Sequence, residues 1–425
     1  MERKITRFLL KWKTDLIRKP LLLFGSRQIG KTFAIVDFGK KYYQNIAYFN
    51  TSHNEPLKNI FKKVRSVERL IPLLSEMSVT DIQKETTLII FDNVEEEDII
   101  TGIKSFGYMK NQYHVIAIAS SKEEIIKYRS EELQYKLMNA MDFEEFLWAC
   151  QQKELSEKIR YAFENKKSCA VHAKAMSLFY EYLITGGFPE AIQAKVSNQP
   201  LAYQQSVQER IFDLYYAELT KCTNLIDIPR GVEVLDSICY QLQKDNKKFQ
   251  YGLLGYGKRA KEYENVIQHL VSNQLLYRSY KIKTVKSPLS SCRELDSFKL
   301  YFIADGLLTC RLHLNKNNLL NDENIRLTLY ENHIAHTLVE AGYSLYYYQS
   351  DGKAEVNFVI QNRMGKIIPI EVATKTGSKA KSLSVFMKKY TTEEAYRITE
   401  NNFAIKKGVR YIPIYAIFCL NDLMY

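Results

Sequence analysis

The sequence lacks the features that mark secreted, zinc-binding and membrane-spanning proteins. Its seven cysteines are scattered, their number is odd, and no two of them form a C-x-x-C pair. This usage is typical of a reduced, intracellular protein without a zinc site. The basic N-terminus does not resemble a signal peptide, because Lys11 and Lys13 interrupt its apolar patch at residues 8–10. The longest apolar runs, such as residues 411–420, are too short to cross a bilayer. We therefore expect a cytoplasmic protein without a membrane partner.

Internal repeats and low-complexity segments are also absent from the sequence, so its bulk properties are those of a globular protein. The chain has 425 residues, and at about 150 residues per domain this length suggests two or three domains. Hydrophobic residues make up 46% of the chain, which is enough for several cores. The net charge of +12 favours a polyanionic partner such as nucleic acid, although many basic proteins bind none.

The strongest motif is a phosphate-binding loop at residues 21–32, LLLFGSRQIGKT. The apolar run Leu21–Phe24 is followed by G-x-x-x-x-G-K-T and then by a predicted helix. The glycines let the backbone turn so that its N–H groups and the helix start face a phosphate. Lys31 would reach the β- and γ-phosphates of ATP, and Thr32 would hold Mg²⁺. The alternative, a glycine-rich turn that matches by chance, is disfavoured by the apolar run in front. The residues expected to bind the nucleotide are Gly25, Ser26, Arg27, Gln28, Ile29, Gly30, Lys31 and Thr32.

A second motif follows about sixty residues later. A predicted buried strand at residues 88–91 ends in Asp92, at the edge where parallel sheets place their ligands. Asp92 is therefore expected to organise Mg²⁺ and its waters. Many ATPases of this kind carry a glutamate at the next position, as the base that orients the attacking water. Here that position is Asn93, which cannot accept a proton.

Three glutamates after Asn93 could replace the missing base. They are Glu95, Glu96 and Glu97. The simpler interpretation, which we favour, is that they begin a surface helix at its favourable end.

A further strand is predicted at residues 115–121, and it ends in Ser120 and Ser121. Ser121 could sense the γ-phosphate, although a helix N-cap at this point explains it equally well. Strands alternate with helical segments up to about residue 150, and a helix start at residues 142–149 closes the pattern. The pattern predicts one α/β nucleotide-binding domain with a parallel sheet. The predicted strands lie at residues 21–24, 46–50, 88–91 and 115–121.

The middle of the chain reads as helical and basic. Residues 151–230 have helical spacing, and Gly186–Pro189 predicts a structural turn in preference to a binding site. Residues 232–285 read as two helices and a hairpin, as in a winged helix. Residues 244–286 carry ten cations and three acids, the concentration that nucleic-acid phosphates require. A solvated face on a packing module is an equal alternative. The cations are Lys244, Lys247, Lys248, Lys258, Arg259, Lys261, Arg278, Lys281, Lys283 and Lys286.

The last hundred residues predict a small α/β domain with a mixed sheet. A helix at residues 329–341 carries Glu331, His333 and His336. The two histidines share a face, but no third ligand is evident, so we expect no metal there. Predicted strands follow at residues 355–360, 367–372 and 410–420.

Five spaced motifs resemble those of a family of prokaryotic AAA-type ATP-binding proteins with a C-terminal region of unknown function. They are GSRQIGKT at 25–32, DFEEFL at 142–147, YLITGGFPEA at 182–191, FKLYFIADGLL at 298–308 and IIPIEV at 367–372. The resemblance covers nearly the whole chain. It implies a P-loop NTPase sheet of the AAA/ASCE type at residues 1–150. A helical lid or linker with a winged-helix module would occupy 151–315, and a nuclease-like α/β domain 316–425.

The final domain is similar to the PD-(D/E)xK nuclease fold, which holds a divalent metal with acidic residues and a lysine. The matching positions are Glu331, Asn357, Glu371 and Ala373. Asn357 lacks the charge that binds Mg²⁺, and Ala373 removes the lysine. Two nearby lysines, Lys375 and Lys381, do not stand at the motif position. The resemblance therefore implies an inactive nuclease domain.

These observations leave three functions open. The first is an ATPase, slowed by Asn93, whose nucleotide state controls the C-terminal modules. The second is an ATP-gated nucleic-acid-binding protein with little or no hydrolysis, and the third is a metal-dependent nuclease, which Asn357 and Ala373 disfavour. The expected cofactors are ATP and Mg²⁺, and a protein partner or a homo-oligomer is also considered. The candidate catalytic residues are Lys31, Asp92, Asn93 and Ser121, and the candidate metal ligands are Thr32 and Asp92.

Overall fold

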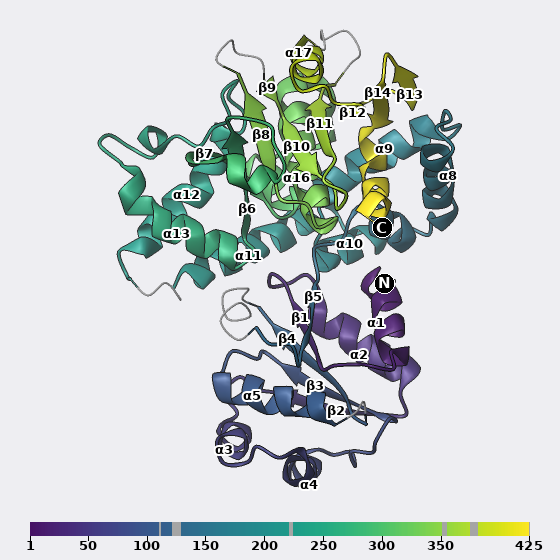
Figure 1. Ribbon diagram of the computed structural model, residues 1–425, viewed down its shortest axis with the longest axis vertical. Helices are drawn as coiled ribbons and strands as arrows, with labels where there is room; N and C mark the ends of the chain where they lie inside the picture. The colour runs from purple at the N-terminus through teal and green to yellow at the C-terminus, as the bar shows by residue number, and fades with distance from the viewer. Residues whose placement is uncertain (110–111, 121–128, 221–223, 351–354, 375–380, 425) are drawn as a thin grey trace. The chain divides into compact units, whose positions relative to one another are not determined.

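The computed structural model describes residues 1–425 except 110–111, 121–128, 221–223, 351–354, 375–380 and 425, and only the backbone of 421–424. The chain divides into two compact units (Figure 1). The first comprises residues 1–139 and 272–274, and the second comprises residues 140–271 and 275–425. The phosphate loop and Asp92 therefore lie in the same unit.

A five-stranded sheet forms the centre of the first unit, in the order β2-β3-β4-β1-β5. All of its pairings are parallel, so the carboxyl ends of the strands share one edge, where ligands bind in such sheets. The strands are β1 (Leu21–Phe24), β2 (Asn45–Asn50), β3 (Thr87–Asp92), β4 (His114–Ala119) and β5 (Gln134–Leu137).

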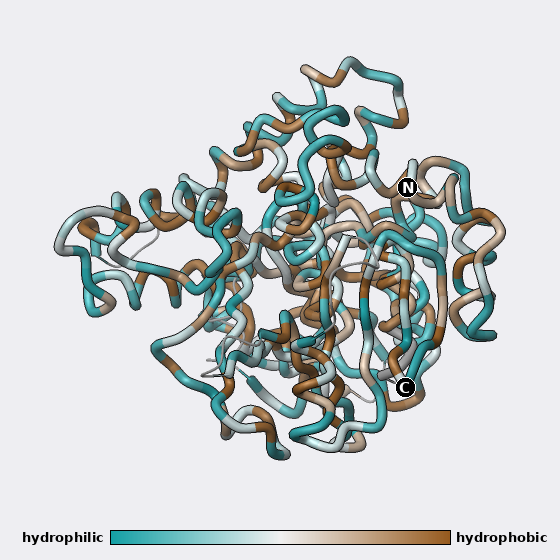
Figure 2. The backbone as a smooth tube through the Cα atoms, turned by 90° about the horizontal axis from the view of Figure 1, so that it is seen from above, coloured by the Kyte–Doolittle hydropathy of each residue, from teal (hydrophilic) through white to brown (hydrophobic). Residues whose placement is uncertain are grey.

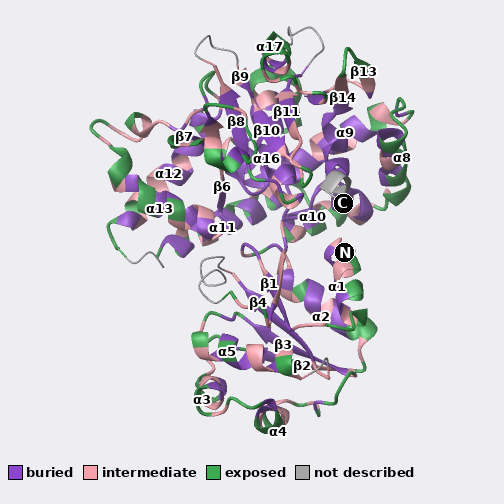
Figure 3. Ribbon diagram, viewed as in Figure 1, coloured by how far each residue is buried: buried purple, intermediate pink, exposed green. Residues whose placement is uncertain are grey.

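Helices cover both faces of this sheet. One face packs on α3–α5, where Phe91 of β3 stacks on Phe49 of β2 and meets Phe61 of α3 edge-on. On the other face, Gly39 of α2 lies against Ile46 and Leu88. Strands β3 and β4 are buried throughout (Figure 3), as expected for parallel strands covered on both sides. The helices are α1 (Ile5–Thr14), α2 (Lys31–Tyr42), α3 (Glu55–Lys63), α4 (Val67–Met77) and α5 (Glu97–Ser105).

The predicted α/β class and the predicted parallel sheet are confirmed, and all four predicted strands are present. The sequence does not predict β5. Its four residues, QYKL, are only half-buried at the sheet edge, so they carry neither an apolar run nor a clear alternation.

The second unit begins with a helical region, as predicted for residues 151–230. The helix predicted to close the nucleotide-binding domain, α7, lies in this unit. The division into three domains at residues 150 and 315 stays a prediction. The helices of this region are α7 (Phe143–Ala149), α8 (Lys153–Glu164), α9 (His172–Thr185), α10 (Pro189–Val196), α11 (Leu201–Leu219), α12 (Asp227–Gln241) and α13 (Ala260–Ser272).

Two sheets complete the second unit. The first has four strands in the order β7-β6-β8-β9, and the second has five in the order β10-β11-β12-β14-β13. The second combines parallel and antiparallel pairs, so the predicted mixed sheet is confirmed. The strands are β6 (Leu276–Ile282), β7 (Arg293–Phe302), β8 (Tyr346–Gln349), β9 (Glu355–Val356), β10 (Phe358–Gln361), β11 (Ile367–Val372), β12 (Ala395–Thr399), β13 (Ala404–Lys406) and β14 (Val409–Pro413). The remaining helices are α14 (Asp305–Arg311), α15 (Lys316–Asn321), α16 (Glu323–Glu340) and α17 (Lys381–Tyr390).

Two details of the C-terminal prediction need correction. Residues 410–420 are not one strand, since β14 ends at Pro413 and 3₁₀ turns (Ile414–Met424) follow. A short, continuous apolar run does not distinguish a buried strand from a buried helical segment. The hairpin β6–β7 is present, but β6 also pairs in parallel with β8. It is therefore part of a larger sheet, which joins residues on both sides of the predicted boundary at 315.

The predicted turn at Gly186–Pro189 lies where two of the sequence motifs meet. Gly186 has a φ of 76°, and a Cβ there would lie 2.4 Å from Cα of Gly306. The carbonyl of Gly187 accepts a hydrogen bond from Met141 N at 2.7 Å. The glycines thus permit close backbone packing, as the structural interpretation of this turn requires.

In the described part of the chain, no helix is both long and apolar enough to span a membrane. Hydrophobic and hydrophilic segments alternate repeatedly along the backbone (Figure 2). The six cysteines that are described are free thiols.

Candidate functional site

The phosphate loop joins the end of β1 to the start of α2, and its two glycines take conformations that other residues rarely adopt. Gly25 has a φ of 154°, and a Cβ there would lie 2.1 Å from the carbonyl oxygen of Met138. Gly30 has a φ of 84° and is the N-cap of α2. Both positions therefore require glycine, as the motif predicts.

Lys31 is held inside the loop. Its side chain is buried, and Nζ donates hydrogen bonds to the carbonyl oxygens of Gly25 and Ser26, both at 2.7 Å. The ammonium group thus lies among the backbone groups that would surround a phosphate. Its position matches the role expected from the motif, in which a lysine neutralises phosphate charge.

Asp92 is connected to the phosphate loop through its side chain. One carboxylate oxygen, Oδ2, accepts hydrogen bonds from Thr32 Oγ1 at 2.8 Å and from Tyr48 Oη at 2.7 Å. The other, Oδ1, accepts one from Asn93 N at 2.9 Å. Hydroxyl and carboxylate oxygens are the ligands that Mg²⁺ prefers, so Thr32 and Asp92 fit the metal that the loop implies.

Tyr48 is a site residue that the sequence analysis misses. It lies on β2, whose register pairs Asn50 with Asp92. Burial, and then the hydrogen bond to Asp92, raise the pKa of Tyr48, so the phenol remains a donor. The sequence signal that could have indicated Tyr48 is a tyrosine near the end of β2, the strand that adjoins β3.

Asn93 occupies the position next to Asp92 and faces the end of β2. Its backbone is left-handed, with a φ of 60°. Nδ2 donates to Asn50 Oδ1 at 3.1 Å, and its carbonyl oxygen accepts from Thr51 Oγ1 at 2.7 Å. The position expected to hold a catalytic base therefore holds an amide paired with a second amide.

The three glutamates that follow Asn93 are separated by the structure. Glu96 pairs with Lys58 at 2.6 Å, and Glu97 is the first residue of α5, which agrees with a surface helix start. Glu95 Oε1 lies 4.0 Å from Nη2 of Arg27 in the phosphate loop. Glu95 is thus the one glutamate of the three that the ion pairs place beside the loop.

The structure says less about the roles of Gln28, Ile29 and the proposed γ-phosphate sensor Ser121. Gln28 has a φ of 62°, and Ile29 is fully buried. Ser121 lies outside the described residues.

The nuclease-like positions form a buried network of charges instead of an open acidic site. Oε1 of Glu331, on α16, accepts from Lys247 Nζ at 2.6 Å and from Asn357 Nδ2 at 3.1 Å. Oε2 accepts from Tyr301 Oη at 3.3 Å and lies 3.8 Å from Lys299 Nζ. Burial alone would raise the pKa of Glu331, but Lys247 and Lys299 lower it overall. The carboxylate is therefore ionised and already neutralised by protein cations.

The remaining nuclease-like positions lie on β11 or follow it in the sequence. Glu371 on β11 pairs with Nε of Arg397 on β12 at 3.4 Å, and Val372 N donates to Asn357 Oδ1. Ala373 is buried, Lys381 begins α17, and Lys375 lies outside the described residues. Among the residues that are described, no three or more His, Cys, Asp or Glu side chains are placed to hold a metal ion.

The histidines of α16 are part of the protein core. His333 Nδ1 lies 2.8 Å from Oδ2 of Asp305, and Asn332 Nδ2 donates to Oδ1 of the same carboxylate at 2.9 Å. Asp305 and His333 are both buried. This cluster links α16 to the start of α14.

Half of the cations in the basic segment at residues 244–286 are engaged in ion pairs. Lys247 pairs with Glu331, Lys258 with Glu233, Arg278 with Glu264, and both Lys281 and Lys283 with Glu294. In the part of the chain that is described, the other five make no ion pair. These five are Lys244, Lys248, Arg259, Lys261 and Lys286.

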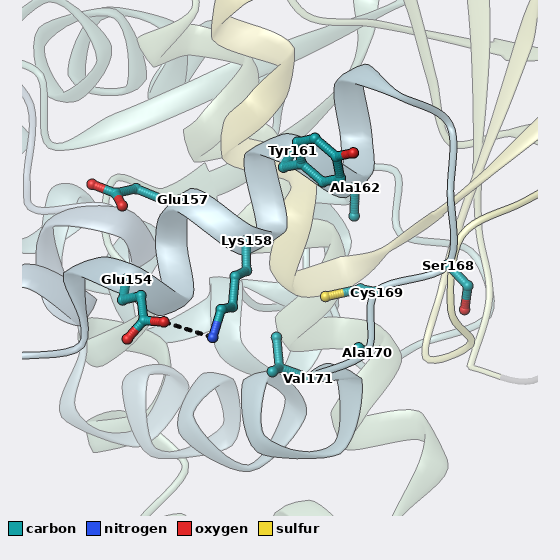
Figure 4. Close-up of a pocket in the computed structure, with 9 residues that line it drawn as sticks. All are labelled: Glu154, Glu157, Lys158, Tyr161, Ala162, Ser168, Cys169, Ala170 and Val171. Carbon is teal, nitrogen blue, oxygen red and sulfur yellow. Dashed lines mark ion pairs between the residues drawn. The ribbon is translucent and has the colours of Figure 1, made fainter.

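A separate pocket of about 500 Å³ lies between α8 and residues 168–171 (Figure 4). Its walls include Tyr161, Cys169 and Val171, and an ion pair between Glu154 and Lys158 lies beside them. It contains none of the residues predicted to bind nucleotide or metal.

Comparison with solved structures gives distant similarities, among them the following three. A signal-transduction ATPase with numerous domains and a tetratricopeptide-repeat sensor, from Pyrococcus horikoshii, has 13% identity over 80% of this chain, with a TM-score of 0.29. This chain spans 45% of the length of that protein. The Aeropyrum pernix ORC1 protein in complex with DNA has 14% identity over 76% of this chain and 92% of its own, with a TM-score of 0.27. PCH-2 of C. elegans has 10% identity over 38% of this chain and 45% of its own, with a TM-score of 0.20. No curated protein sequence matches the chain.

Three families of domains match successive parts of the sequence. The AAA domain family matches residues 17–147, which contain the phosphate loop, Tyr48 and Asp92. Two domains of unknown function follow, DUF8612 at residues 176–318 and DUF4143 at residues 328–417. The chain therefore contains an AAA domain at residues 17–147 and a C-terminal DUF4143 domain at residues 328–417.

Proposed function

We propose that the protein binds Mg-ATP in the loop at residues 25–32 and hydrolyses it slowly, and that the nucleotide controls the C-terminal modules. The observation that carries the proposal is the 2.8 Å hydrogen bond between Thr32 and Asp92, beside a phosphate loop that encloses Lys31. It brings together the hydroxyl, the carboxylate and the ammonium group that Mg-ATP requires.

Each residue of the site has a defined role in this proposal. The loop backbone between Gly25 and Gly30 binds phosphate oxygens, Lys31 neutralises their charge, and Thr32 and Asp92 hold Mg²⁺. When bound, Mg²⁺ stabilises the charge that develops on the phosphate oxygens. Tyr48 keeps the Asp92 carboxylate in place through a hydrogen bond to Oδ2.

Slow hydrolysis follows from the amide at Asn93. An amide can orient a water molecule by hydrogen bonding, but it cannot take the proton of that water. General-base assistance is typically worth about 10²–10⁴-fold in rate. Glu95 also lies beside the loop, with Oε1 4.0 Å from Nη2 of Arg27.

Control of the C-terminal modules is supported by the way the chain leaves the AAA domain. Met138 N donates to Phe24 O at 2.8 Å, directly before the phosphate loop. Three residues later, Met141 is anchored in the second unit, where Gly187 accepts from its N–H at 2.7 Å and Tyr182 Oη donates to its carbonyl at 2.9 Å. Only residues 139 and 140 separate these two positions in the sequence, so we propose that a change in the loop reaches the second unit through this short segment.

Calorimetric titration with Mg-ATP tests the proposal directly. Lys31→Ala should abolish binding or weaken it strongly, because it removes the cation from the phosphate site. Lys40→Ala is the matched control, since Lys40 is an exposed lysine on the same helix. If Lys31→Ala binds Mg-ATP as tightly as the wild type, the proposed site is wrong.

Nucleic acid is the second proposed ligand, through the five cations of residues 244–286 that make no ion pair within the described structure. Four of them, Lys244, Arg259, Lys261 and Lys286, are exposed. Neutralising Arg259, Lys261 and Lys286 together should reduce the salt dependence of DNA binding by roughly one phosphate contact per residue. Neutralising the paired Lys281 and Lys283 should have a smaller effect. A lack of any mobility shift at low salt, with or without ATP, removes DNA as a partner.

A further inference from the structure

Arg3 is buried against the phosphate loop, 22 residues before Gly25 in the sequence. Only 7% of the residue is exposed. Nη1 donates a hydrogen bond to the carbonyl oxygen of Ile29 at 2.7 Å, and Nη2 donates to that of Asn139 at 2.8 Å. The guanidinium group therefore joins the loop to Asn139, the last residue of the segment 1–139 that forms most of the first unit.

The bond to Ile29 fixes the orientation of one peptide group in the loop. A trans peptide is planar, and its C=O and N–H groups point in opposite directions. Because Arg3 holds the oxygen of Ile29, the N–H of Gly30 must point away from Arg3. Gly30 is the N-cap of α2, so its N–H belongs to the set of backbone donors that a phosphate at this loop would meet.

The bond to Asn139 fixes the same guanidinium on its other side. The segment at residues 138–139 is itself packed against the loop, since Met138 N donates to Phe24 O and the Met138 carbonyl leaves no room for a Cβ at Gly25. The first end of the phosphate loop thus rests on this segment, and Arg3 connects the segment to Ile29 near the other end of the loop. Charged donors make stronger hydrogen bonds than neutral ones, and the planar fork of arginine can hold two carbonyls at once.

We propose that Arg3 is a positioning residue of the nucleotide site, which holds the Ile29–Gly30 peptide with its N–H toward the bound phosphate. The proposal rests on the proposed function, because it assumes that this loop binds ATP. Arg3 acts through the backbone of Gly30 and does not itself touch the ligand.

The test compares Arg3→Met and Arg3→Lys with Lys11→Met in the full-length protein. Lys11 is exposed on α1 and controls for the loss of one positive charge. The affinities for Mg-ATP and for inorganic pyrophosphate are measured by calorimetry, and the thermal midpoint is recorded without ligand. Pyrophosphate has no base or sugar, so it isolates the phosphate contacts.

Arg3→Met should weaken the binding of both ligands by roughly tenfold or more, as expected for a lost hydrogen bond to a charged group. Arg3→Lys should lie between Arg3→Met and the wild type, because an ammonium group can hold one of the two carbonyls. Lys11→Met should bind like the wild type. If Arg3→Met does not fold, Arg3→Lys decides the question alone.

Folded Arg3 variants that bind both ligands like the wild type overturn this inference, even where their thermal midpoint falls. That result leaves the proposed function intact. A wild-type protein that binds neither Mg-ATP nor pyrophosphate overturns the proposed function itself, and this inference with it.

Discussion

Each unit buries one carboxylate at a position singled out from the sequence: Asp92 at the predicted Mg²⁺ site, and Glu331 at a nuclease-like position where no metal is expected. The partners of the two carboxylates carry different charges. Asp92 and Glu331 are both 4% exposed. Asp92 is surrounded by neutral donors, namely the hydroxyls of Thr32 and Tyr48 and the N–H of Asn93. Glu331 meets the ammonium groups of Lys247 and Lys299.

This difference decides which carboxylate can accept a metal ion. A buried charge is costly unless an opposite charge compensates it. Asp92 makes no ion pair with any residue that the structure describes, so a bound Mg²⁺ would supply the missing charge. Glu331 has that charge already, and a metal ion would have to displace two lysines. Two acids that are equally buried can therefore differ in their ability to bind a metal ion, because the charge of their partners decides it.

Removing one lysine from Glu331 should produce the largest effect. We expect Lys247→Met to destabilise the second unit by about 3–5 kcal/mol, because it removes the nearer of the two ammonium groups that compensate the buried charge of Glu331. Trp148 lies in this unit, and its fluorescence in a Trp12→Phe background would follow denaturant unfolding. Lys248→Met is the matched control, since Lys248 makes no ion pair in the described structure. Equal stability of the two variants would show that the Glu331 network does not hold the unit together.

Restoring a base beside Asp92 should have the next largest effect. We expect Asn93→Glu to raise ATP turnover by about 10²-fold, the lower end of the usual range for general-base assistance. Asn93→Gln is the control, because it lengthens the side chain and adds no base. A wild-type rate that is already as fast as that of Asn93→Glu would contradict the assignment of Asn93 as the cause of slow hydrolysis.

Mild acid should have a smaller effect, which in the first unit arises from His114. Burial, with help from Arg18 and Lys13, lowers the pKa of His114 to about 3, against about 6.5 in an unfolded chain. The unfolded state then binds more protons between these values, so the first unit loses stability as the pH falls below about 6.5. The pKa of Glu331 is lowered instead, so its contribution is present above about pH 4.3 and is lost only below that value.

Denaturant unfolding at pH 7 and pH 5 would measure the loss of stability of the first unit. Trp12 reports on the first unit in a Trp148→Phe background, and its ring lies 5.9 Å from that of His114. The loss of stability at pH 5 should be reduced in His114→Gln. An equal loss in both proteins would assign the acid sensitivity to other groups.

Much of the AAA unit could be predicted from the sequence, because its signals are local. Strands β1 and β3 contain continuous apolar runs; β1 leads directly into Gly25 of the phosphate loop, and β3 ends in Asp92. Strand β5 and the contact of Tyr48 with Asp92 could not be predicted in this way. The contact depends on the register between β2 and β3, and no local pattern specifies that register.

In the second unit, even more of the contacts could not be predicted from local sequence patterns. Lys247 contributes to the basic count at residues 244–286, yet its side chain is buried against Glu331, 84 residues away. A count of charges cannot tell an exposed cation from one that is already paired. Asn357 and Ala373 mark in the sequence where the nuclease-like motif is incomplete, but the lysines that pair with Glu331 come from outside the motif.

The most direct test is a Mg²⁺ titration of ATP binding by calorimetry, for the wild type, Asp92→Asn and Glu331→Gln. We expect Mg²⁺ to strengthen ATP binding by the wild type and by any folded Glu331→Gln protein, and Asp92→Asn to lose this gain while it keeps the fold of the sheet. If Asp92→Asn retains the full effect of Mg²⁺, the carboxylate at the end of β3 is not the metal ligand, and the contrast between the two buried acids has no functional meaning.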